Sequence, residues 1–254
     1  MTCAIIQARM GSTRLPGKVL RDMAGKPLIG HLMDRLRPSK LVDQFIVATT
    51  DNPEDDALAS WCASHGIACF RGSDWDVLDR FYRACLTAVQ QPLHVVRICC
   101  DNPLHHHRVL DFVIAGYLRM GVDYASNSNF EPDYLEDGFD TEVFSYTALE
   151  RAWRESRMLS QREHVTPYIK NSGHFSCYWR KYDTRYTFKL SVDTEDDLRM
   201  AEQIIRSFAD PLSFGLEDVT DLLLTHPGML EANKDSKINE GYARSIKEDR
   251  QVYD

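Results

Sequence analysis

Apolar strands and amphipathic helices alternate through the first half of the chain, and this alternation limits the fold more than any other feature. Short apolar runs at 4–7, 45–49, 67–70 and 95–98 are predicted strands. Strands that alternate with helices form βαβ units, so we expect an α/β fold with a mostly parallel sheet. Apolar side chains at helical spacing between the strands are predicted core residues: Leu28, Leu32, Met33 and Leu36; Ala57, Leu58, Trp61 and Cys62; Val77, Leu78, Phe81, Cys85 and Val89.

The first predicted strand opens directly into a loop that contains glycines and cations. Gly11 and Gly17 let backbone N–H groups approach an anion closely. Arg9, Arg14 and Lys18 supply the positive charge that a triphosphate needs. The loop is not a Walker A loop, because its glycines are one residue too far apart and no serine or threonine follows the lysine. We therefore predict a cradle for phosphate groups, with a solvated basic turn as the alternative.

Composition limits the class of protein further. A chain of 254 residues is long enough for one large α/β domain or two small ones. Its formal net charge of −8 argues against general nucleic-acid binding. The seven cysteines include no Cys-x-x-Cys pair, and the sequence shows neither a secretion-type leader nor an apolar run of membrane-spanning length. We expect a reduced, cytoplasmic enzyme that has no nucleic-acid or membrane partner.

The pattern Arg-x-Gly-Ser-x-Arg-x-Pro-Gly-Lys at 9–18 resembles the opening of the 3-deoxy-manno-octulosonate and acylneuraminate cytidylyltransferases. It looks closest to the branch of spore-coat polysaccharide biosynthesis protein F. The resemblance covers most of the chain and implies a Rossmann-like fold of the nucleotide-diphospho-sugar transferase type, which binds CTP. It also implies nucleotide-binding roles for a set of residues: Gln7, Ala8, Arg9, Gly11, Ser12, Arg14, Lys18 and Arg97.

Asp101 follows the predicted strand at 95–98, at the sheet edge where α/β proteins expose functional groups. A carboxylate there can hold Mg²⁺ against phosphate oxygens, since magnesium takes one or two protein carboxylates beside substrate oxygens and water. A turn or helix-cap aspartate is the alternative. The run 100–104 resembles the Gly-Asp-x-Pro-Leu element of the family with Cys100 in place of the glycine, and this departure leaves the nucleotide base open.

Asp193 is the second candidate carboxylate, at the end of a strand-like run before a helix. Thr194 and Asp197 form a shortened capping box, so a well-capped helix is the alternative reading. The run 192–198 resembles the family element Val-Asp-Thr-x-x-Asp-Leu, whose first aspartate completes the metal site. Asp101 and Asp193 are thus the predicted Mg²⁺ ligands. The predicted catalytic residues are Arg9, Arg14, Lys18, Asp101 and Asp193.

Two further segments are candidates for the acceptor side of the site. Acidic residues recur in the stretch 137–142, where alternate positions of an extended chain share one face. That face can receive sugar hydroxyls or a cation, or it is a solvated acidic edge, and the resemblance to an Asp-Gly-x-Asp-x-Glu-Val-Phe run favours the substrate. The run 162–169 also looks like the polysaccharide branch, and its histidine is either a donor to the acceptor or structural. The predicted substrate-binding residues are Asp137, Asp140, Glu142 and His164.

The chain is predicted to form one nucleotidyltransferase domain, 1–228, followed by a charged C-terminal extension, 229–254. The regular rhythm breaks into a polar, turn-rich region at about 122–146. The resemblance implies that a small substrate and dimerisation region is inserted there, so we expect a homodimer. A helix at 147–155, a strand-like run at 175–182 and helices from about 194 and 217 complete the predicted domain.

These features predict a Mg²⁺-dependent nucleotidyltransferase that transfers CMP from CTP to an anionic, sugar-like acceptor and releases pyrophosphate. One alternative is a sugar-nucleotide-dependent glycosyltransferase of the same fold, which would not need so many cations against a leaving pyrophosphate. The other is a catalytically silent nucleotide- or sugar-binding protein, against which the two strand-end carboxylates argue. The sequence does not identify the acceptor.

Overall fold

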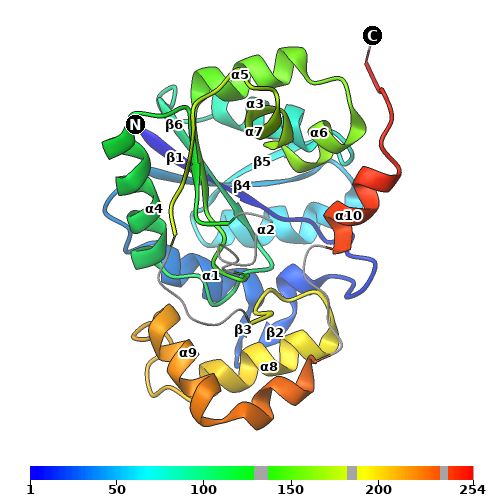
Figure 1. Ribbon diagram of the computed structural model, residues 1–254. Coiled ribbons are helices and arrows are strands. Elements are labelled where there is room, and N and C mark those ends of the chain that lie inside the picture. Colours follow the sequence, from blue (N-terminus) through cyan, green and yellow to red (C-terminus); the bar gives the residue numbers. More distant parts are fainter. Residues whose placement is uncertain (129–136, 182–187, 235–239, 254) are drawn as a thin grey trace.

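A computed structural model describes residues 1–128, 137–181, 188–234 and 240–253 (Figure 1). Its centre is a seven-stranded sheet in the order β5-β4-β1-β6-β8-β7-β9, and β2 and β3 form a separate hairpin. The strands are β1 (Thr2–Gln7), β2 (Asp22–Met23), β3 (Lys26–Pro27), β4 (Gln44–Thr50), β5 (Ala68–Gly72), β6 (His94–Cys99), β7 (Tyr124–Ser126), β8 (Glu142–Ser145) and β9 (Cys177–Trp179).

Strand direction confirms the predicted fold class. β5, β4, β1 and β6 are parallel neighbours, and they are the four strands predicted in the first half of the chain, with only their ends shifted. β9 is parallel to β7, whereas β8 runs antiparallel to both β6 and β7. β7 and β8 lie in the region predicted as an insert, 122–146, yet both belong to the main sheet. The middle of that region, 129–136, lies outside the described residues.

The helices form layers on both faces of the sheet. Figure 1 shows α3, α5, α6 and α7 on one side and α1, α8 and α9 on the other. In the described ranges no helix is long and apolar enough to cross a membrane. The helices are α1 (Leu28–Leu36), α2 (Asp56–Ser64), α3 (Val77–Leu86), α4 (His107–Met120), α5 (Tyr146–Glu155), α6 (Leu159–His164), α7 (Pro167–Asn171), α8 (Glu195–Arg206), α9 (Leu216–Thr225) and α10 (Glu240–Lys247).

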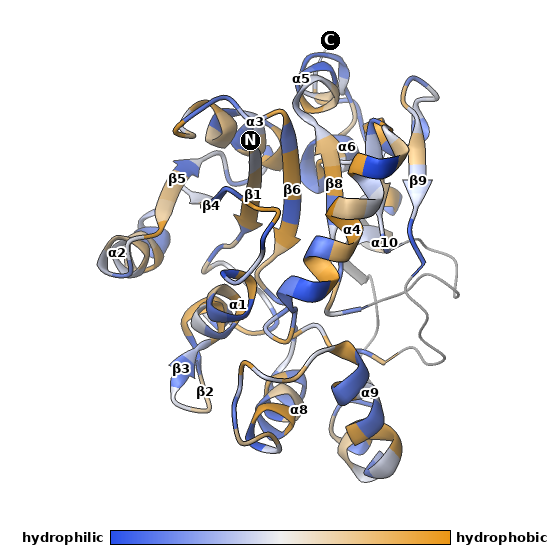
Figure 2. Cartoon of the chain, turned by 90° about the vertical axis from the view of Figure 1, so that its left-hand side faces the viewer, coloured by the Kyte–Doolittle hydropathy of each residue, from blue (hydrophilic) through white to orange (hydrophobic). Residues whose placement is uncertain are grey.

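The two-residue period of the strands assigns their side chains to two cores. On β1, Ala4 and Ile6 belong to the core that includes α1 and α4, whereas Ile5 belongs to the core that includes α3 and α5. Figure 2 shows how apolar the central strands β1, β6 and β8 are. On β6, Val95 faces the α3 side, and Arg97, two residues further on, shares that face near the carboxyl end of the strand. The positively charged side chain of Arg97 therefore lies at the end of the strand, beyond the apolar core.

Two predicted core residues, Ala57 and Val89, are wrong, because both are exposed. Val89 continues the apolar pattern of α3, but the helix ends at Leu86 and Val89 is 91% exposed. The N–H groups of Thr87 and Ala88 bond to carbonyls only three residues back, at Ala84 and Cys85. This tighter last turn ends the helix, so Val89 lies beyond it and does not pack against the sheet.

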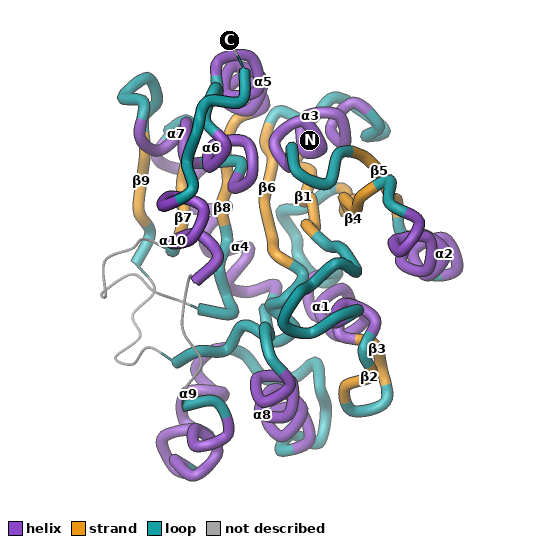
Figure 3. The backbone as a smooth tube through the Cα atoms, turned by 90° about the vertical axis from the view of Figure 1, so that its right-hand side faces the viewer, coloured by secondary structure: helices purple, strands orange, loops and turns teal. Residues whose placement is uncertain are grey.

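Part of the predicted C-terminal extension packs against the domain. A 3₁₀ helix, Pro227–Ala232, contacts α8. Next to it, the Asn233 side chain donates to the Lys189 carbonyl at 2.9 Å and to the Asp197 carboxylate at 3.1 Å. Further along, α10 packs beside α6 (Figure 3). The division of the chain into domains stays a prediction.

A buried ion pair joins α3 to α6. Asp76 caps α3 by accepting the Asp79 N–H at 2.9 Å. The Arg162 Nε lies 2.9 Å and 3.0 Å from the two Asp76 carboxylate oxygens, and the side chains are only 4% and 3% exposed. Arg162, which belongs to the run that resembles the polysaccharide branch, is thus structural: it positions the helix that ends at His164.

Arg162→Ala is expected to lower the free energy of unfolding by about 3–5 kcal/mol, because it leaves the Asp76 carboxylate buried without its partner. Urea unfolding followed by circular dichroism measures this change. Arg154→Ala is the control, since it breaks an exposed ion pair with Glu150 and should cost less than about 1 kcal/mol. Equal losses in the two variants would contradict a stabilising role for the buried pair.

Candidate active site

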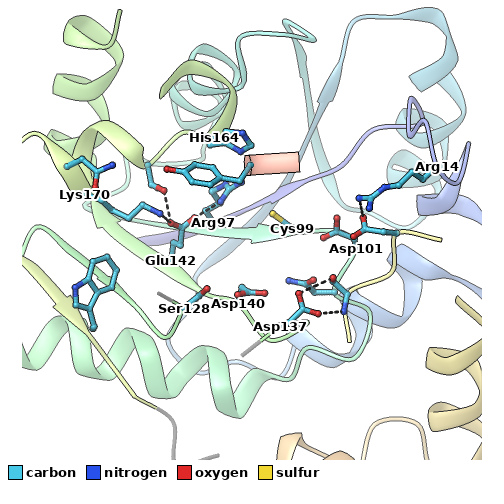
Figure 4. A pocket seen from close by; sticks show the side chains of 17 residues that line it. Arg14, Arg97, Cys99, Asp101, Ser128, Asp137, Asp140, Glu142, His164 and Lys170 are labelled. Atoms are coloured by element: carbon cyan, nitrogen blue, oxygen red, sulfur yellow. Dashed lines mark hydrogen bonds and ion pairs between the residues drawn. The ribbon is translucent and has the colours of Figure 1, made fainter. Parts of the chain in front are cut away.

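Two adjoining cavities open at the carboxyl ends of β1 and β6. The loop cavity, named for the loop that follows β1, has a volume of about 730 Å³. The acidic cavity, named for the carboxylates on its wall, has a volume of about 310 Å³ (Figure 4). Four residues line both cavities and mark their junction: Arg14, Cys99, Asp101 and Asp193.

The structure brings the predicted site residues together in two groups. Arg97, also predicted to bind the nucleotide, lines the acidic cavity, because the alternation of β6 directs its side chain there. There it donates to the Gln7 side chain at 3.0 Å, so it contacts one of the other predicted nucleotide-binding residues. The other predicted nucleotide-binding residues line the loop cavity: Gln7, Ala8, Arg9, Gly11, Ser12, Arg14 and Lys18. The predicted substrate-binding residues line the acidic cavity: Asp137, Asp140, Glu142 and His164.

The loop after β1 has a fixed conformation. Met10 is its hub: its N–H donates to Asp55 at 2.6 Å, and its carbonyl accepts the N–H groups of Ser12 and Gly17 at 2.8 Å and 2.9 Å. Gly17 adopts a φ of 68°, in the left-handed region that other residues avoid. The glycine that the sequence singled out is therefore required by the backbone of the loop.

Lys18 lies between the two predicted metal ligands. Its Nζ is 3.0 Å from a carboxylate oxygen of Asp101, 3.0 Å from one of Asp193 and 2.8 Å from the Val192 carbonyl. Burial disfavours the ammonium, but the two carboxylates outweigh burial and raise the pKa of Lys18 above its usual value. A contact that joins residues 18, 101 and 193 thus forms the junction of the two cavities.

The chemistry of this junction fits a magnesium ion. The two carboxylate oxygens are equally distant from a single nitrogen, so one cation can reach both. The Val192 N–H donates to the Asp101 carbonyl at 2.7 Å and fixes the two segments side by side. Larger groups of His, Cys, Asp or Glu suited to a metal do not occur in the described ranges. Two carboxylates completed by substrate oxygens and water are a usual magnesium ligand set.

Asp193 is also oriented by the start of α8. The predicted capping box is present, and the Asp197 carboxylate accepts the N–H groups of Asp193 at 3.0 Å and Thr194 at 2.9 Å. Lys189 lies 3.3 Å from Asp193 and 3.2 Å from Asp197. Burial alone would raise the pKa of Asp193, but Lys18, Lys189 and Arg14 lower it. The helix cap and the ionised Asp193 are therefore parts of one arrangement.

Glu142 is the best-satisfied carboxylate of the acidic cavity. It forms an ion pair with Arg97, accepts hydrogen bonds from the hydroxyls of Tyr124 and Thr166 at 2.6 Å each, and lies 3.3 Å from Lys170. Burial opposes its charge, but Lys170 and Arg97 outweigh burial and keep the pKa of Glu142 below its usual value. Glu142 thus holds two cations at the cavity wall (Figure 4).

Asp137 and Asp140 differ from the extended acidic face that the sequence predicts. The strand begins only at Glu142, because residues 137–139 form a turn and a bend. Asp137 accepts the N–H groups of Leu190 and Ser191 at 2.7 Å and 2.8 Å, so it connects this turn to the segment before Asp193. Burial and the neighbouring Asp137 raise the pKa of Asp140 to about 7.

His164 ends α6 at the wall of the acidic cavity. Its Nε2 is buried and has no hydrogen-bond partner among the described residues. Burial and the nearby Arg97 lower its pKa to about 4, so the imidazole is neutral at physiological pH. Val165 follows with a φ of 69°, which is unusual for a β-branched residue. The same His164 nitrogen lies 3.9 Å from the Glu163 carboxylate and the ring packs edge-on against Tyr242, so the choice between an acceptor-binding and a structural His164 stays a prediction.

Comparison with known proteins identifies the family. A cytidylyltransferase family model matches residues 3–235, so the chain belongs to this family of nucleotidyltransferases. It is 36% identical over 248 residues to the uncharacterized protein MJ1063 of Methanocaldococcus jannaschii, covering 96% of this chain and 98% of that protein. It is 33% identical over 232 residues to the spore coat polysaccharide biosynthesis protein SpsF of Bacillus subtilis, covering 88% and 94%.

Among solved structures, a cytidylyltransferase from Leptospira borgpetersenii matches with a TM-score of 0.84 at 27% identity, covering 93% of this chain and 98% of that one. Both the resemblance to the spore-coat branch and the nucleotidyltransferase class are therefore confirmed.

The residues at these cavities that sequence reasoning missed include three lysines and a tyrosine: Lys170, Lys189, Lys247 and Tyr242. Lys189 stands four residues before Asp193, and that spacing was the one available signal. Lys170 meets Glu142 only through the packing of α7 on β8, and no local pattern predicts such a contact.

The pH dependence of stability should report the environment of Asp140. Its pKa of about 7 in the fold lies above the ordinary value of 3.8, so the folded protein keeps a proton that the unfolded chain releases. The free energy of unfolding should therefore fall as pH rises from about 4 to 7, by at most about 1.4 kcal/mol per pH unit for this group.

Asp140→Asn removes this titration, so its stability relative to the wild type should increase across the same pH range. Urea unfolding at several pH values measures it, with Asp196→Asn, which changes an exposed ion pair with Arg199, as the control. Stability curves of wild type and Asp140→Asn that run parallel with pH would contradict the raised pKa.

Proposed function

We propose that this protein is a Mg²⁺-dependent cytidylyltransferase that transfers CMP from CTP to an acidic sugar or a related anionic, sugar-like acceptor. The observation that supports it best is the junction of the two cavities at Asp101 and Asp193. A nucleotide in the loop cavity and an acceptor in the acidic cavity would meet beside these carboxylates. The product would serve surface polysaccharide or glycoconjugate synthesis, which the name of the Bacillus subtilis relative supports.

The reaction needs positioning more than covalent help from the protein. An acceptor oxygen forms a bond to the α-phosphorus of CTP, the bond from that phosphorus to pyrophosphate breaks, and the acceptor proton passes to water. Asp101 and Asp193 would hold a magnesium ion, which would neutralise charge on the reacting phosphate. Arg9 and Arg14 line the same cavity and would stabilise the leaving pyrophosphate.

The acidic cavity offers specific groups to an anionic acceptor. Arg97 and Lys170 are held at its wall by Glu142. The unpartnered Nε2 of His164 is available to hydrogen-bond with an acceptor oxygen. These cations and the neutral imidazole support recognition of an acid group, and the carboxylates can receive sugar hydroxyls.

Asp101→Asn and Asp193→Asn should each lower turnover at least about 100-fold while the circular dichroism spectrum stays that of the wild type. Loss of one preorganised charge next to a reacting phosphate costs about 3–4 kcal/mol of transition-state stabilisation. Pyrophosphate release from CTP, at saturating Mg²⁺ and with a panel of acidic sugars, measures the effect. Near-normal rates in either variant would remove that residue from the mechanism, and Asp196→Asn controls for loss of an exposed acid.

Cys100→Gly tests whether the departure from the family pattern sets the nucleotide base. Cys100 is 2% exposed and lines the loop cavity, and its φ is not positive, so the backbone does not require glycine there. We expect the variant to keep its preference among the four nucleoside triphosphates, with kcat/KM ratios within about threefold of the wild type. A shift of about tenfold or more, equal to ~1.4 kcal/mol, would instead make Cys100 a selectivity residue.

A further inference from the structure

The C-terminal arm, residues 240–253, reaches the active site from the far end of the sequence. The matched family model ends at residue 235, so the arm lies outside the part of the chain that defines the family. In the structure α10 lies beside α6 (Figure 3). Residues of α10 line both cavities.

Side-chain hydrogen bonds attach the arm to α6. The Ser245 hydroxyl donates to the Glu163 carboxylate at 2.6 Å. The Asp249 carboxylate accepts the backbone N–H of Ser160 at 2.9 Å and its hydroxyl at 2.8 Å. Ser245 is buried and Ser160 is only 3% exposed, so these contacts are shielded from water.

The end of the arm is attached to the buried ion pair between α3 and α6. The Tyr253 hydroxyl donates to the Asp76 carboxylate at 2.8 Å. The guanidinium carbon of Arg162 lies 4.8 Å from the centre of the Tyr253 ring, a cation–π distance. The arm is therefore attached at one point within α10 and at two points beyond it, which fixes its position.

Helical spacing determines which side chains of α10 face the cavities. Ala243 and Lys247 are one turn apart, share a face of the helix, and both line the loop cavity. Tyr242 lines the acidic cavity, with its ring centre 4.9 Å from that of His164. Ser245 lies on the side that contacts α6. The orientation of α10 therefore directs the Lys247 side chain toward the loop cavity.

The charges in the loop cavity show why an additional cation matters. Arg9 forms an ion pair with Asp74 at 2.6 Å, and Arg14 forms one with Asp193 at 3.0 Å. Lys18 contacts both Asp101 and Asp193. The loop cations are thus already engaged with carboxylates, whereas a nucleoside triphosphate brings several negative charges into the same cavity. Lys247 adds a cation from a separate element.

We propose that Lys247 is a substrate-binding residue that contacts the β- or γ-phosphate of the nucleoside triphosphate, and that the C-terminal arm positions it. The proposal rests on the nucleotidyltransferase reaction and not on the identity of the acceptor. The reacting α-phosphate must lie at the junction with the acidic cavity, and Lys247 lines the loop cavity alone. Because the phosphates carry the negative charge of the nucleotide, we assign its ammonium to the phosphates that leave and not to the base or ribose.

Calorimetric titration of CTP, CMP and pyrophosphate into the full-length protein, each with Mg²⁺, tests this assignment. Lys247→Ala should raise the Kd for CTP and for pyrophosphate about tenfold, a typical loss for one charged contact, and change the Kd for CMP less than about twofold. Lys247→Arg should restore most of the CTP affinity. Arg250→Ala is the matched control, since it removes an exposed positive charge of the same arm that lines neither cavity.

Asp249→Ala tests whether the arm positions Lys247, because it removes the contacts of the arm to Ser160. It should weaken the binding of CTP more than the binding of CMP, while the circular dichroism spectrum is unchanged. Wild-type affinity for CTP in Lys247→Ala, equal losses for CTP and CMP, or an equal effect of Arg250→Ala would each overturn the assignment of Lys247. In those cases pyrophosphate release by the wild-type protein would still support the proposed function. A wild-type protein that binds no nucleoside triphosphate would overturn both this inference and the proposed function.

Discussion

The contact of the Lys18 ammonium with Asp101 and Asp193 is the interaction on which the active site depends. It joins the loop after β1, the end of β6 and the segment before α8, which are far apart in the sequence. Two partly buried carboxylates that lie against the same nitrogen would repel each other if no cation stood between them. Lys18 therefore provides a charge that holds the site together before any ligand arrives, and a magnesium ion would meet carboxylates that are already oriented.

The sheet determines on which side of this contact each function lies. Strand alternation gives each of β1, β6 and β8 an apolar part inside the core and a polar residue on the α3 face near the site: Gln7, Arg97 and Glu142. Because β8 runs antiparallel to β6, its first residue, not its last, lies opposite Arg97. The reversal of one strand thus brings Glu142 to the cavity and makes the acidic wall possible.

The sequence predicted the features that depend on local patterns. The strands, the helix start at Thr194 and the loop glycines follow from periodicity, capping and backbone conformation, which nearby residues determine. The pairing of Glu142 with Lys170 and the position of α10 depend on how distant elements pack, and a single sequence contains no pattern for such contacts. Arg97 is an intermediate case: its strand was predicted, but the sequence did not show which cavity its side chain would line.

The run 162–169 shows how one short segment can combine stability with chemistry. Arg162 is one partner of a buried ion pair. His164, two residues later, lines the acidic cavity, and its Nε2 has no hydrogen-bond partner among the described residues. The same buried pair accepts Tyr253 from the C-terminal arm, and the arm in turn places Tyr242 against His164. The position of the imidazole therefore depends on contacts from two directions, through α6 and through the arm. Burying a histidine nitrogen without a hydrogen bond costs free energy, and these contacts from two directions offset part of that cost.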